Sequence, residues 1–532
     1  MRRWNGWGDD TIPYHLPANG PAFLEQYVGR GEPPRDAVLA DVLRLVPPGR
    51  LPPHPLVTAE AMDRLRHARG QSLPDWVALR SGRIPAFPDG VAYPTTAADV
   101  AELLAWAAAV DARVIPYGGG TSVVGHINPE PGARPVLTIN LRRLNQMGRL
   151  DSVSQLATFG AGVAGPELEA QLRARGFTLG HFPQSFEYST LGGWVATRSS
   201  GQQSLGYGRI ESLFAGGMLL SPAGDLRLPP YPASAAGPDL RQLVLGSEGR
   251  LGILTEVTVR VTPLPEHEEF HAVFFPDFVA GMTATRRIVQ SRLPLSLLRL
   301  STATETRTTL ALAGHERVIG LLETLLGVRG VGDDKCMLLC GFTGSADATR
   351  ASRGHVLDLC REHGGVSAGR RFGEQWMESR FRTPYLRNAL WDEGYAVDTL
   401  ETATTWDKVP RMVERIEAVL HAALADEGER IHVFTHLSHV YPQGASIYTT
   451  YLYRQAGSPD ETLRRWEALK GAASRTILEC GGTISHQHGV GRDHAPYLAA
   501  EKGALGLAAL ADVARRFDPD GRMNPGILFA EG

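Results

Sequence analysis

The spacing of apolar residues between positions 86 and 265 switches repeatedly between a helical and an extended period. Thr96-Ala97-Ala98-Asp99 resembles a helix-capping box, and apolar residues recur after it at helical spacing. Val114-Ile115-Pro116 then predicts a short strand that leads into a glycine loop. The segment 254–261 alternates apolar and polar residues, as a half-buried strand does. We therefore predict an α/β domain over residues 86–265.

The pattern changes after residue 265. Helical periods cover 407–425 and 460–479, and strand-like runs lie at 335–342 and 447–453. This mixture predicts a second domain, of the α+β class, over residues 266–505. Residues 1–85 are rich in proline and arginine, and we expect them to form an extension wrapped around the larger body. Residues 506–532 are expected to return to the site in the first domain.

Composition narrows the class of protein. A chain of 532 residues exceeds what one hydrophobic core usually supports, and 43% hydrophobic residues with 21% charged residues is an ordinary globular mixture. The 54 basic side chains nearly balance 57 acidic ones, so we expect no nucleic-acid partner. The four cysteines lie at no metal-like spacing, which predicts a reducing compartment without a disulfide framework. We identify neither a signal peptide nor a membrane-spanning stretch and expect a cytoplasmic enzyme.

Two glycine loops in the first domain suit an anionic ligand. Pro116-Tyr117-Gly118-Gly119-Gly120-Thr121-Ser122 follows a predicted strand, and successive glycines can turn consecutive N–H groups toward one point. A tight surface turn is the alternative for this loop. Gly246-Ser247-Glu248-Gly249-Arg250-Leu251-Gly252 allows a large ligand to approach the backbone. It lacks the Lys-Ser/Thr ending of a P-loop, which disfavours nucleotide triphosphate hydrolysis.

A third segment, Gly160-Ala161-Gly162-Val163-Ala164-Gly165, matches the Rossmann fingerprint G-x-G-x-x-G. Glu187 lies roughly where the ribose-binding acid of that fold belongs. However, another glycine loop precedes this segment, and Glu187 falls in a polar loop and not at the end of a strand. We therefore interpret these glycines as a tight strand-to-helix turn and not as a dinucleotide site.

Further motifs follow one another in a fixed order. They are Ala68–Asp75, Phe87-Pro88-Asp89, the 116–122 loop, Gly180–Thr190, Gly192-Gly193-Trp194, Thr197–Gly201 and 248–254. This series resembles the alkyldihydroxyacetonephosphate synthase family, within the FAD-binding proteins of the vanillyl-alcohol oxidase and p-cresol methylhydroxylase fold. The resemblance implies an α+β fold with a two-part FAD-binding domain of the p-cresol methylhydroxylase type and an α+β substrate (cap) domain.

The resemblance also implies which residues bind FAD. They are Pro116, Tyr117, Gly118, Gly119, Gly120, Thr121, Ser122, Gln184, Ser185, Phe186, Glu187, Tyr188, Ser189, Thr190, Thr197, Arg198, Ser199, Ser200, Glu248, Gly249, Arg250, Leu251, Gly252, Ile253 and Leu254. Gln184 stands where the family usually has an acid. No histidine or cysteine matches the positions at which related oxidases tether the flavin, and His126 does not fit those patterns. Non-covalent FAD is therefore implied.

On the substrate side, Tyr385-Leu386-Arg387-Asn388 resembles the family segment whose arginine binds the substrate phosphate. A guanidinium suits a phosphate monoester because it is permanently charged and can donate two parallel hydrogen bonds. A surface ion pair is the alternative for Arg387. Arg299 matches another family arginine, and its apolar neighbours predict a strand in which it has a partner or lines a cavity. His181 is the third substrate-binding residue that the resemblance implies.

Three residues are the implied catalytic groups: Tyr448, His486 and His488. Ser446-Ile447-Tyr448 resembles the segment with the catalytic tyrosine of the family, and 485–491 resembles its active-site histidine run. In an extended segment His486 and His488 face one side, and Gln487, which replaces a histidine of the family, points away. Packing in a core is the alternative for Tyr448.

A metal site is the competing hypothesis for the histidines. It would use His486 and His488 with His436 and His439. We find no Asp or Glu that completes it convincingly and therefore predict no metal.

The resemblance implies an FAD-dependent enzyme of ether lipid synthesis, which exchanges the acyl chain of acyl-dihydroxyacetone phosphate for a fatty alcohol. The run 517–528 looks more like the D-lactate dehydrogenase and glycolate oxidase branch of the fold. An FAD-linked oxidase or dehydrogenase of a 2-hydroxy acid or other alcohol is therefore the alternative, and a binding protein without catalysis is disfavoured because the arginine, tyrosine and histidines remain. We expect a small-molecule or lipid substrate and leave peripheral membrane contact and a homodimer open.

Overall fold

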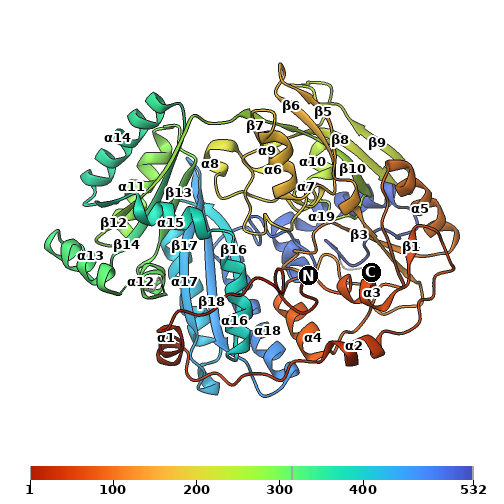
Figure 1. Cartoon of the computed structure of the whole chain (residues 1–532), viewed down its shortest axis with the longest axis horizontal. Helices are drawn as coiled ribbons and strands as arrows, with labels where there is room; N and C mark the ends of the chain where they lie inside the picture. The colour runs from red at the N-terminus through yellow and green to blue at the C-terminus, as the bar shows by residue number, and fades with distance from the viewer. Residues whose placement is uncertain (1, 313–315, 530–532) are drawn as a thin grey trace.

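The computed structural model of the chain describes residues 2–312 and 316–529 (Figure 1). Positions 530–532 of the predicted C-terminal segment lie outside the described residues. The described part contains a four-stranded, a five-stranded and a seven-stranded sheet, together with the two-stranded pair β7 (Phe177–Thr178) and β11 (Thr262–Pro263). The predicted mixture of helices and strands is confirmed, with two sheets in the first part of the chain and one large sheet in the second.

The four-stranded sheet carries the first glycine loop. Its order is β1 (Val57–Thr58), β2 (Gly90–Ala92), β4 (Val136–Asn140) and β3 (Arg113–Tyr117). β2, β4 and β3 run parallel, so the glycine loop leaves the carboxyl end of β3. Behind the sheet lies α5 (Ala97–Ala109), which begins at the predicted capping box of Thr96 and Asp99.

The five-stranded sheet is antiparallel. Its order is β5 (Met147–Asp151), β6 (Leu156–Gly160), β10 (Ile253–Arg260), β8 (Phe214–Ser221) and β9 (Gly224–Leu228). The strand expected at 254–261 is therefore confirmed as β10. The helices of this part are α6 (Gly165–Arg173), α7 (Leu191–Thr197), α8 (Ser204–Tyr207), α9 (Ile210–Leu213) and α10 (Arg241–Val244).

The G-x-G-x-x-G segment lies between β6 and α6 and forms no Rossmann unit, because β6 is antiparallel to both of its neighbours. A Cβ on Gly160 would lie 2.4 Å from the carbonyl oxygen of Leu144, and one on Gly162 would lie 1.6 Å from that of Leu141. These glycines let two backbone segments cross closely, which agrees with the turn interpretation.

The seven-stranded antiparallel sheet dominates the second part of the chain. Its order is β15 (Val366–Gly369), β12 (His267–Phe275), β14 (Cys336–Gly344), β13 (Leu297–Ser301), β17 (His432–Val440), β18 (Gly444–Arg454) and β16 (Tyr395–Thr405). One face packs on α11 (Phe278–Gln290), α14 (Ala346–Glu362), α17 (Val409–Ala422) and α18 (Pro459–Glu479) in a single large core. The strands and helices expected at 335–342, 447–453, 407–425 and 460–479 are all present.

The opposite face of the same sheet is only partly covered by helices. They are α12 (Ala303–Leu312), α13 (Glu316–Val328), α15 (Arg371–Ser379) and α16 (Thr383–Asp392). A smaller core forms beneath α12, α13 and α15. The remaining part of this face is available to the site described below.

The N-terminal residues begin near the middle of the view of Figure 1 and then run along the lower edge of the molecule through α1 and α2. Their helices are α1 (Gly20–Tyr27), α2 (Leu39–Leu45), α3 (Ala61–Arg66) and α4 (Leu73–Ser81). The side-chain amide of Asn388 in α16 makes two hydrogen bonds to the main chain of Trp7. It accepts from the backbone N–H (3.1 Å) and donates to the carbonyl (3.0 Å). Arg80 of α4 pairs with Asp36 (2.5 Å) and Asp392 (3.1 Å). The first 85 residues are therefore tied to the second half of the chain.

The C-terminal residues return to the four-stranded sheet. α19 (Leu498–Phe517) is interrupted at Gly503, and a parallel bridge then joins Met523 to Val114 of β3. Three of the four cysteines, Cys336, Cys340 and Cys360, are buried, and all four are free thiols. Among the described residues, the helices are too short or too polar to cross a lipid bilayer.

Candidate active site

A cavity of about 520 Å³ lies between the first domain and the seven-stranded sheet. Its walls come from the first glycine loop, from parts of the segment 183–202, from the loop at 247–254 and from side chains on one face of the sheet. This volume is in the range of small-molecule and cofactor sites.

The first glycine loop forms a cradle in which side chains would not fit. A Cβ on Gly119 would lie 1.9 Å from the carbonyl oxygen of Tyr188, and one on Gly118 would lie 2.3 Å from Oγ1 of Thr190. Gly120 has a φ of 64°, a conformation that glycine adopts without strain. The whole loop 116–122 lines the cavity. Such a close backbone approach suits a pyrophosphate, which is bound mainly by main-chain groups.

Glu248 joins the cavity wall formed by the loop at 247–254 to the C-terminal part of the chain. Its carboxylate accepts from the N–H groups of Val490 (2.5 Å) and Gly491 (2.8 Å) and lies 3.1 Å from Nε2 of His126. Its carbonyl accepts from the Asn524 amide (2.6 Å). The carboxylate is thus occupied by the protein, so Glu248 contributes shape to the wall.

Most of the residues predicted to bind FAD line this cavity. They are 116–122, Gln184, Ser185, Ser189, Thr190, Thr197, Ser199, Ser200, Glu248, Gly249, Gly252 and Leu254. The others, Phe186, Glu187, Tyr188, Arg198, Arg250, Leu251 and Ile253, do not line it and brace its walls instead. For example, Phe186 stacks on Phe381 (4.9 Å), and Arg250 donates to the Met523 carbonyl (2.7 Å).

His181 is also placed outside the cavity, in contrast to the expected contact with substrate. Its side chain is buried behind Ser199, with Nε2 3.2 Å from Oγ, and its ring lies 4.7 Å from that of Trp194. Burial lowers the pKa of His181 to about 3, so the imidazole is neutral. The geometry therefore fits a packed core histidine.

The floor of the cavity is one face of the seven-stranded sheet. Alternate residues of four strands point into it because strand side chains alternate between faces. They are Leu297 and Arg299 of β13, Val397 and Thr399 of β16, His432, Phe434, His436 and Ser438 of β17, and Tyr448, Thr450 and Leu452 of β18. Val397, Phe434 and Leu452 pack together with α1, and the polar His432 also contacts the rings of Phe23 and Tyr27 in that helix.

Arg387 of α16 is a partly buried cation at the wall of this cavity. Its Nη1 donates to the Gln71 carbonyl, and its guanidinium lies 4.5 Å from the ring centroid of Trp76. Its Nη2 is buried without a hydrogen-bond partner, and no described carboxylate forms an ion pair with it. Burial lowers the pKa of Arg387, yet a guanidinium remains charged in proteins. Asp398 and Asp75 also act on this charge, and the free Nη2 donors are suited to a phosphate or carboxylate.

Arg299 lies on the cavity floor in a different setting. Its Nη2 donates to Glu305 (2.5 Å) and lies 3.3 Å from Nδ1 of His436, which is itself 2.8 Å from the other Glu305 oxygen. Burial alone would raise the pKa of Glu305, but His436 and Arg299 hold it below its usual value. The charge of Arg299 is therefore neutralised by the protein before any ligand binds.

Tyr448 faces the cavity between two imidazoles. Its ring stacks on His436 with centroids 4.9 Å apart, and it meets the His488 ring edge-on at 5.8 Å. Burial raises the pKa of Tyr448 above its ordinary value and lowers that of His488. The phenol is thus protonated and the imidazole neutral at neutral pH, which places a proton donor beside a proton acceptor.

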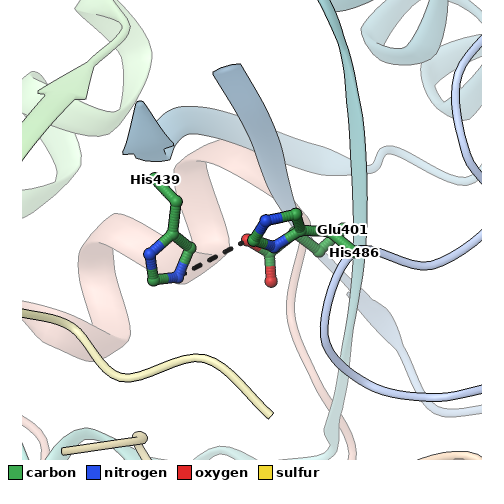
Figure 2. Close-up of side chains that lie close together, drawn as sticks. All are labelled: Glu401, His439 and His486. Atoms are coloured by element: carbon green, nitrogen blue, oxygen red, sulfur yellow. Dashed lines mark ion pairs between the residues drawn. The ribbon is translucent and has the colours of Figure 1, made fainter. Parts of the chain in front are cut away.

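His486 does not line the cavity, whereas Gln487 and His488 do. The prediction that Gln487 points away is therefore wrong, because the segment turns and is not extended there. Figure 2 shows His486 near Glu401 and His439, whose ligand atoms all lie within 4.8 Å of one another. The distances from Glu401 Oε1 are 3.2 Å to Nδ1 of His486 and 4.0 Å to Nε2 of His439. A carboxylate, unforeseen from the sequence, thus lies beside two of the histidines.

The far end of the cavity is apolar. It is lined by Leu16, Phe23, Leu24, Leu312, Leu386, Leu390, Val397, Phe434 and Leu452. These residues come from α1, α12, α16 and three strands that are far apart in the sequence. The cavity therefore joins a polar end, which contains Arg387 and Tyr448, to an apolar end suited to a hydrocarbon chain.

Several residues of the site gave little signal in the sequence. Trp7 and Asn524 reach the cavity from opposite ends of the chain, Glu305 is the single acid of α12, and Glu401 shares β16 with Asp398. Only the alternation along 395–405 could have singled out Glu401, as a lone acid on the inward face of a predicted strand. Trp7 and Asn524 could not have been found in this way, because no periodicity links them to the site.

Comparison with known proteins gives consistent results over the whole chain. Residues 88–227 match the FAD binding domain family, and residues 264–528 match the family of FAD linked oxidases, C-terminal domain. An alkyldihydroxyacetonephosphate synthase of Dictyostelium discoideum is 31% identical over 473 residues, which are 88% of this chain and 77% of that protein. A solved alkyldihydroxyacetonephosphate synthase structure superposes with a TM-score of 0.84 at 26% identity, covering 98% of both chains. A p-cresol methylhydroxylase structure superposes with a TM-score of 0.67 at 15% identity, over 88% of this chain and 93% of that one.

The fold and the glycine cradle define a flavin-dependent enzyme with a two-part FAD-binding domain of the p-cresol methylhydroxylase type. FAD is its cofactor, and the loop at 116–122 fits this ligand because three successive glycines line the cavity with main-chain groups alone. Within this class, the chain belongs to the alkyldihydroxyacetonephosphate synthase family.

Proposed function

We propose that the chain exchanges the acyl group of acyl-dihydroxyacetone phosphate for a fatty alcohol, as the name of its relatives implies. Arg387 is the observation that carries this proposal. The buried Nη2 of this guanidinium has no hydrogen-bond partner among the described residues, and a phosphate monoester can accept its hydrogen bonds. The second support is the apolar end of the same cavity, which accommodates the chain of the ester or of the alcohol.

Arg387, His488 and Tyr448 at the polar end of the cavity have separate roles in the reaction. Arg387 fixes the phosphate, and the ester-bearing carbon at the other end of the three-carbon unit is thereby placed near Tyr448 and His488. His488, which is neutral, takes the proton of the incoming alcohol, while the Tyr448 hydroxyl donates to the departing carboxylate. Bound FAD supplies a ring that accepts and returns electrons at the substrate carbon. The ester C–O bond on the glycerone side breaks and an ether C–O bond forms, so the overall exchange is not a redox reaction.

The alternative function is an FAD-linked oxidase or dehydrogenase. It is favoured by the match of residues 264–528 to FAD linked oxidases, C-terminal domain. In that reaction His488 takes the proton of a substrate hydroxyl, and Arg387 holds the carboxylate of a 2-hydroxy acid. The apolar end of the cavity has no role with so small a substrate, which is why the transferase is the preferred proposal.

One experiment separates the two functions. Purified protein is reconstituted with FAD and given acyl-dihydroxyacetone phosphate and hexadecanol without oxygen. We expect an ether product and a free fatty acid in equal amounts, with no lasting change in the flavin absorbance. In a parallel sample with 2-hydroxy acids, we expect no bleaching. Bleaching by a hydroxy acid, together with no ether product, would contradict the transferase.

A lipid substrate also suggests a bilayer as the source. α13 exposes Leu321, Leu325 and Val328, with 63%, 59% and 81% of their surfaces accessible, one or two turns apart. The neighbouring α12 contributes Leu312 to the apolar end of the cavity. We expect wild-type protein to float with phosphatidylcholine vesicles and Leu325→Glu to lose this, while equal flotation of both would exclude α13 as the contact. The homodimer remains a prediction.

A further inference from the structure

The histidine segment of the active site is held from behind by a buried network. Arg209, in the loop before α9, donates through Nη1 to Nε2 of His486 (2.7 Å) and through Nη2 to the His486 carbonyl (2.8 Å). The Tyr441 hydroxyl lies 2.7 Å from the same Nε2. On the other side of the ring, Nδ1 lies 3.2 Å from Oε1 of Glu401. Nε2 of His486 is therefore held by hydrogen bonds, whereas Nδ1 faces the Glu401 carboxylate at ion-pair distance without hydrogen-bond geometry.

Arg209 determines which nitrogen of His486 carries the proton. A guanidinium has only donors, so the Nε2 atom that faces it must be an acceptor. The proton of the neutral imidazole then belongs to Nδ1, which faces the Glu401 carboxylate. In this tautomer His486 can neither give a proton to the cavity nor offer a free lone pair at Nδ1 to a metal ion.

Glu401 anchors the backbone as well as the ring. Its carbonyl accepts from the His486 N–H (3.0 Å), and its carboxylate accepts from Ser438 Oγ (2.5 Å). Burial alone would raise the pKa of Glu401, but the adjacent His486 ring holds it well below its usual value. Glu401 is therefore an ionised, fully buried carboxylate directly behind the residues that line the cavity.

We propose that Arg209, His486 and Glu401 form a positioning relay that holds Gln487 and His488 at the cavity, and that His486 transfers no proton. This inference rests on the proposed function only in that His488 is the group positioned. His486 instead faces a second cavity of about 870 Å³, which it shares with Arg209 and Tyr441. The predicted catalytic role of His486 is thereby replaced by an orienting one.

Amide substitutions at position 486 test the relay. The side-chain amide of His486→Asn can donate where Nδ1 does, and that of His486→Gln can accept where Nε2 does, yet neither can carry a titrating proton. We expect both variants to keep kcat within about 10-fold of wild type, whereas His488→Asn loses about 10²-fold or more. His486→Ala loses the contacts of both ring nitrogens. Its kcat is expected to lie between those of the amide variants and that of His488→Asn, with the KM for the phosphate substrate unchanged. Loss in His486→Asn and His486→Gln as severe as in His488→Asn would overturn the proposal.

Glu401 and Arg209 supply the matched controls. Glu401→Gln and His486→Asn are expected to be non-additive when combined, because they break the same contact. Glu269→Gln removes another buried glutamate of the same sheet, which pairs with Arg353 (2.8 Å) away from the cavity, and is expected to lower the thermal midpoint without changing kcat. Additive losses for Glu401→Gln and His486→Asn would contradict the relay.

A readout without turnover separates this inference from the proposed function. In ¹⁵N-histidine-labelled holoenzyme at pH 7.5, the His486 signal, assigned by its absence in His486→Asn, is expected to show a protonated Nδ1 and an unprotonated Nε2. The opposite tautomer would overturn the relay whether or not ether product is formed. Elemental analysis completes the test, because a stoichiometric metal present in wild type and lost in His486→Asn would assign the Glu401, His439 and His486 cluster to a metal.

Discussion

The cofactor half and the substrate half of the cavity are formed by different kinds of structural element. The cofactor half consists of loops whose glycines leave no room for side chains: a Cβ on Gly119 would lie 1.9 Å from the Tyr188 carbonyl, and one on Gly118 would lie 2.3 Å from Oγ1 of Thr190. The substrate half consists of side chains on alternate positions of four strands, such as Arg299 and Tyr448. The first half depends on side chains being absent, and the second depends on which side chains are present.

This difference separates what is fixed from what can vary. Backbone cradles recognise a pyrophosphate through shape, so many sequences bind the same cofactor as long as the glycines remain. A sheet face can exchange one side chain for another without loss of its strands, because the opposite face holds the core. New substrates therefore arise by changes on the sheet face, and the predictions below challenge each half in turn.

The largest effect is expected in the cradle. Gly119→Ala places a methyl group 1.9 Å from the Tyr188 carbonyl, so the loop or the 188–190 segment must move. We expect this variant to be purified without yellow colour and to take up no FAD in a titration monitored at the flavin absorbance. Gly354→Ala, in the exposed part of α14 where nothing lies within 4 Å, is the control and should bind FAD as wild type does. Normal colour in Gly119→Ala would show that the cradle is not formed by close backbone approach.

The next largest effect belongs to the phenol. Tyr448→Phe keeps the stacking on His436 but removes the only hydroxyl of that ring, and proton transfer by a positioned group is typically worth about 10²–10⁴-fold. We expect kcat to fall by this amount while the FAD spectrum is unchanged. Steady-state kinetics of ether formation checks it. A rise in KM with unchanged kcat would mean that the hydroxyl contributes to substrate binding alone.

The two arginines are expected to differ. Arg387→Ala removes an unpaired cation, and loss of charged hydrogen bonds of about 1.5–3 kcal/mol lowers kcat/KM about 10- to 150-fold with FAD retained. Inorganic phosphate should inhibit wild type and not this variant. Arg299→Ala leaves Glu305 buried without its cation, so its main effect is expected on the thermal midpoint. Loss of colour in Arg387→Ala would place that arginine in the cofactor half.

The stability of the region where the segment around Asp493 meets the first glycine loop should depend on pH. Asp493 follows Arg492, whose N–H bonds the Val124 carbonyl near the first loop, and burial raises the pKa of Asp493 from 3.8 to about 7. Between these values the folded protein holds a proton that the unfolded chain releases, so this group lowers stability as pH rises from about 4 to about 7. Asp493→Asn is expected to raise the thermal midpoint at pH 8 and to leave it nearly unchanged at pH 4. Equal shifts at both values would contradict the assignment.

The smallest effect is expected at the apolar end. Phe434→Ala enlarges the space between α1 and the sheet, and each additional buried CH₂ contributes about 0.8 kcal/mol, or roughly 4-fold in affinity. We expect the preference among alcohols of increasing length to shift toward longer chains by a few-fold, measured by competition between two alcohols in one reaction. An unchanged preference would mean that the chain does not lie against Phe434.

The sequence predicted the cofactor half better than the substrate half for a physical reason. Glycine loops after strands are local features, so the 116–122 cradle and the strand at 254–261 could be recognised without knowledge of the fold. His181 was assigned to the substrate because a motif surrounds it, yet its ring packs against Trp194. Whether Gln487 or His486 faces the cavity depends on a turn held by Arg209, which lies 277 residues from His486. Long-range contacts of this kind leave no periodic trace in a single sequence.

The hydrogen bonds of Asn524 determine when during synthesis the FAD site can close. Its amide joins the carbonyls of His126 and Glu248, which belong to two different walls of the FAD cradle, and the adjacent Met523 bridges β3. During synthesis these three segments cannot meet before residue 524 has emerged from the ribosome. We therefore expect a chain truncated after residue 520 to lack the hydrogen bonds that join these two walls of the FAD site.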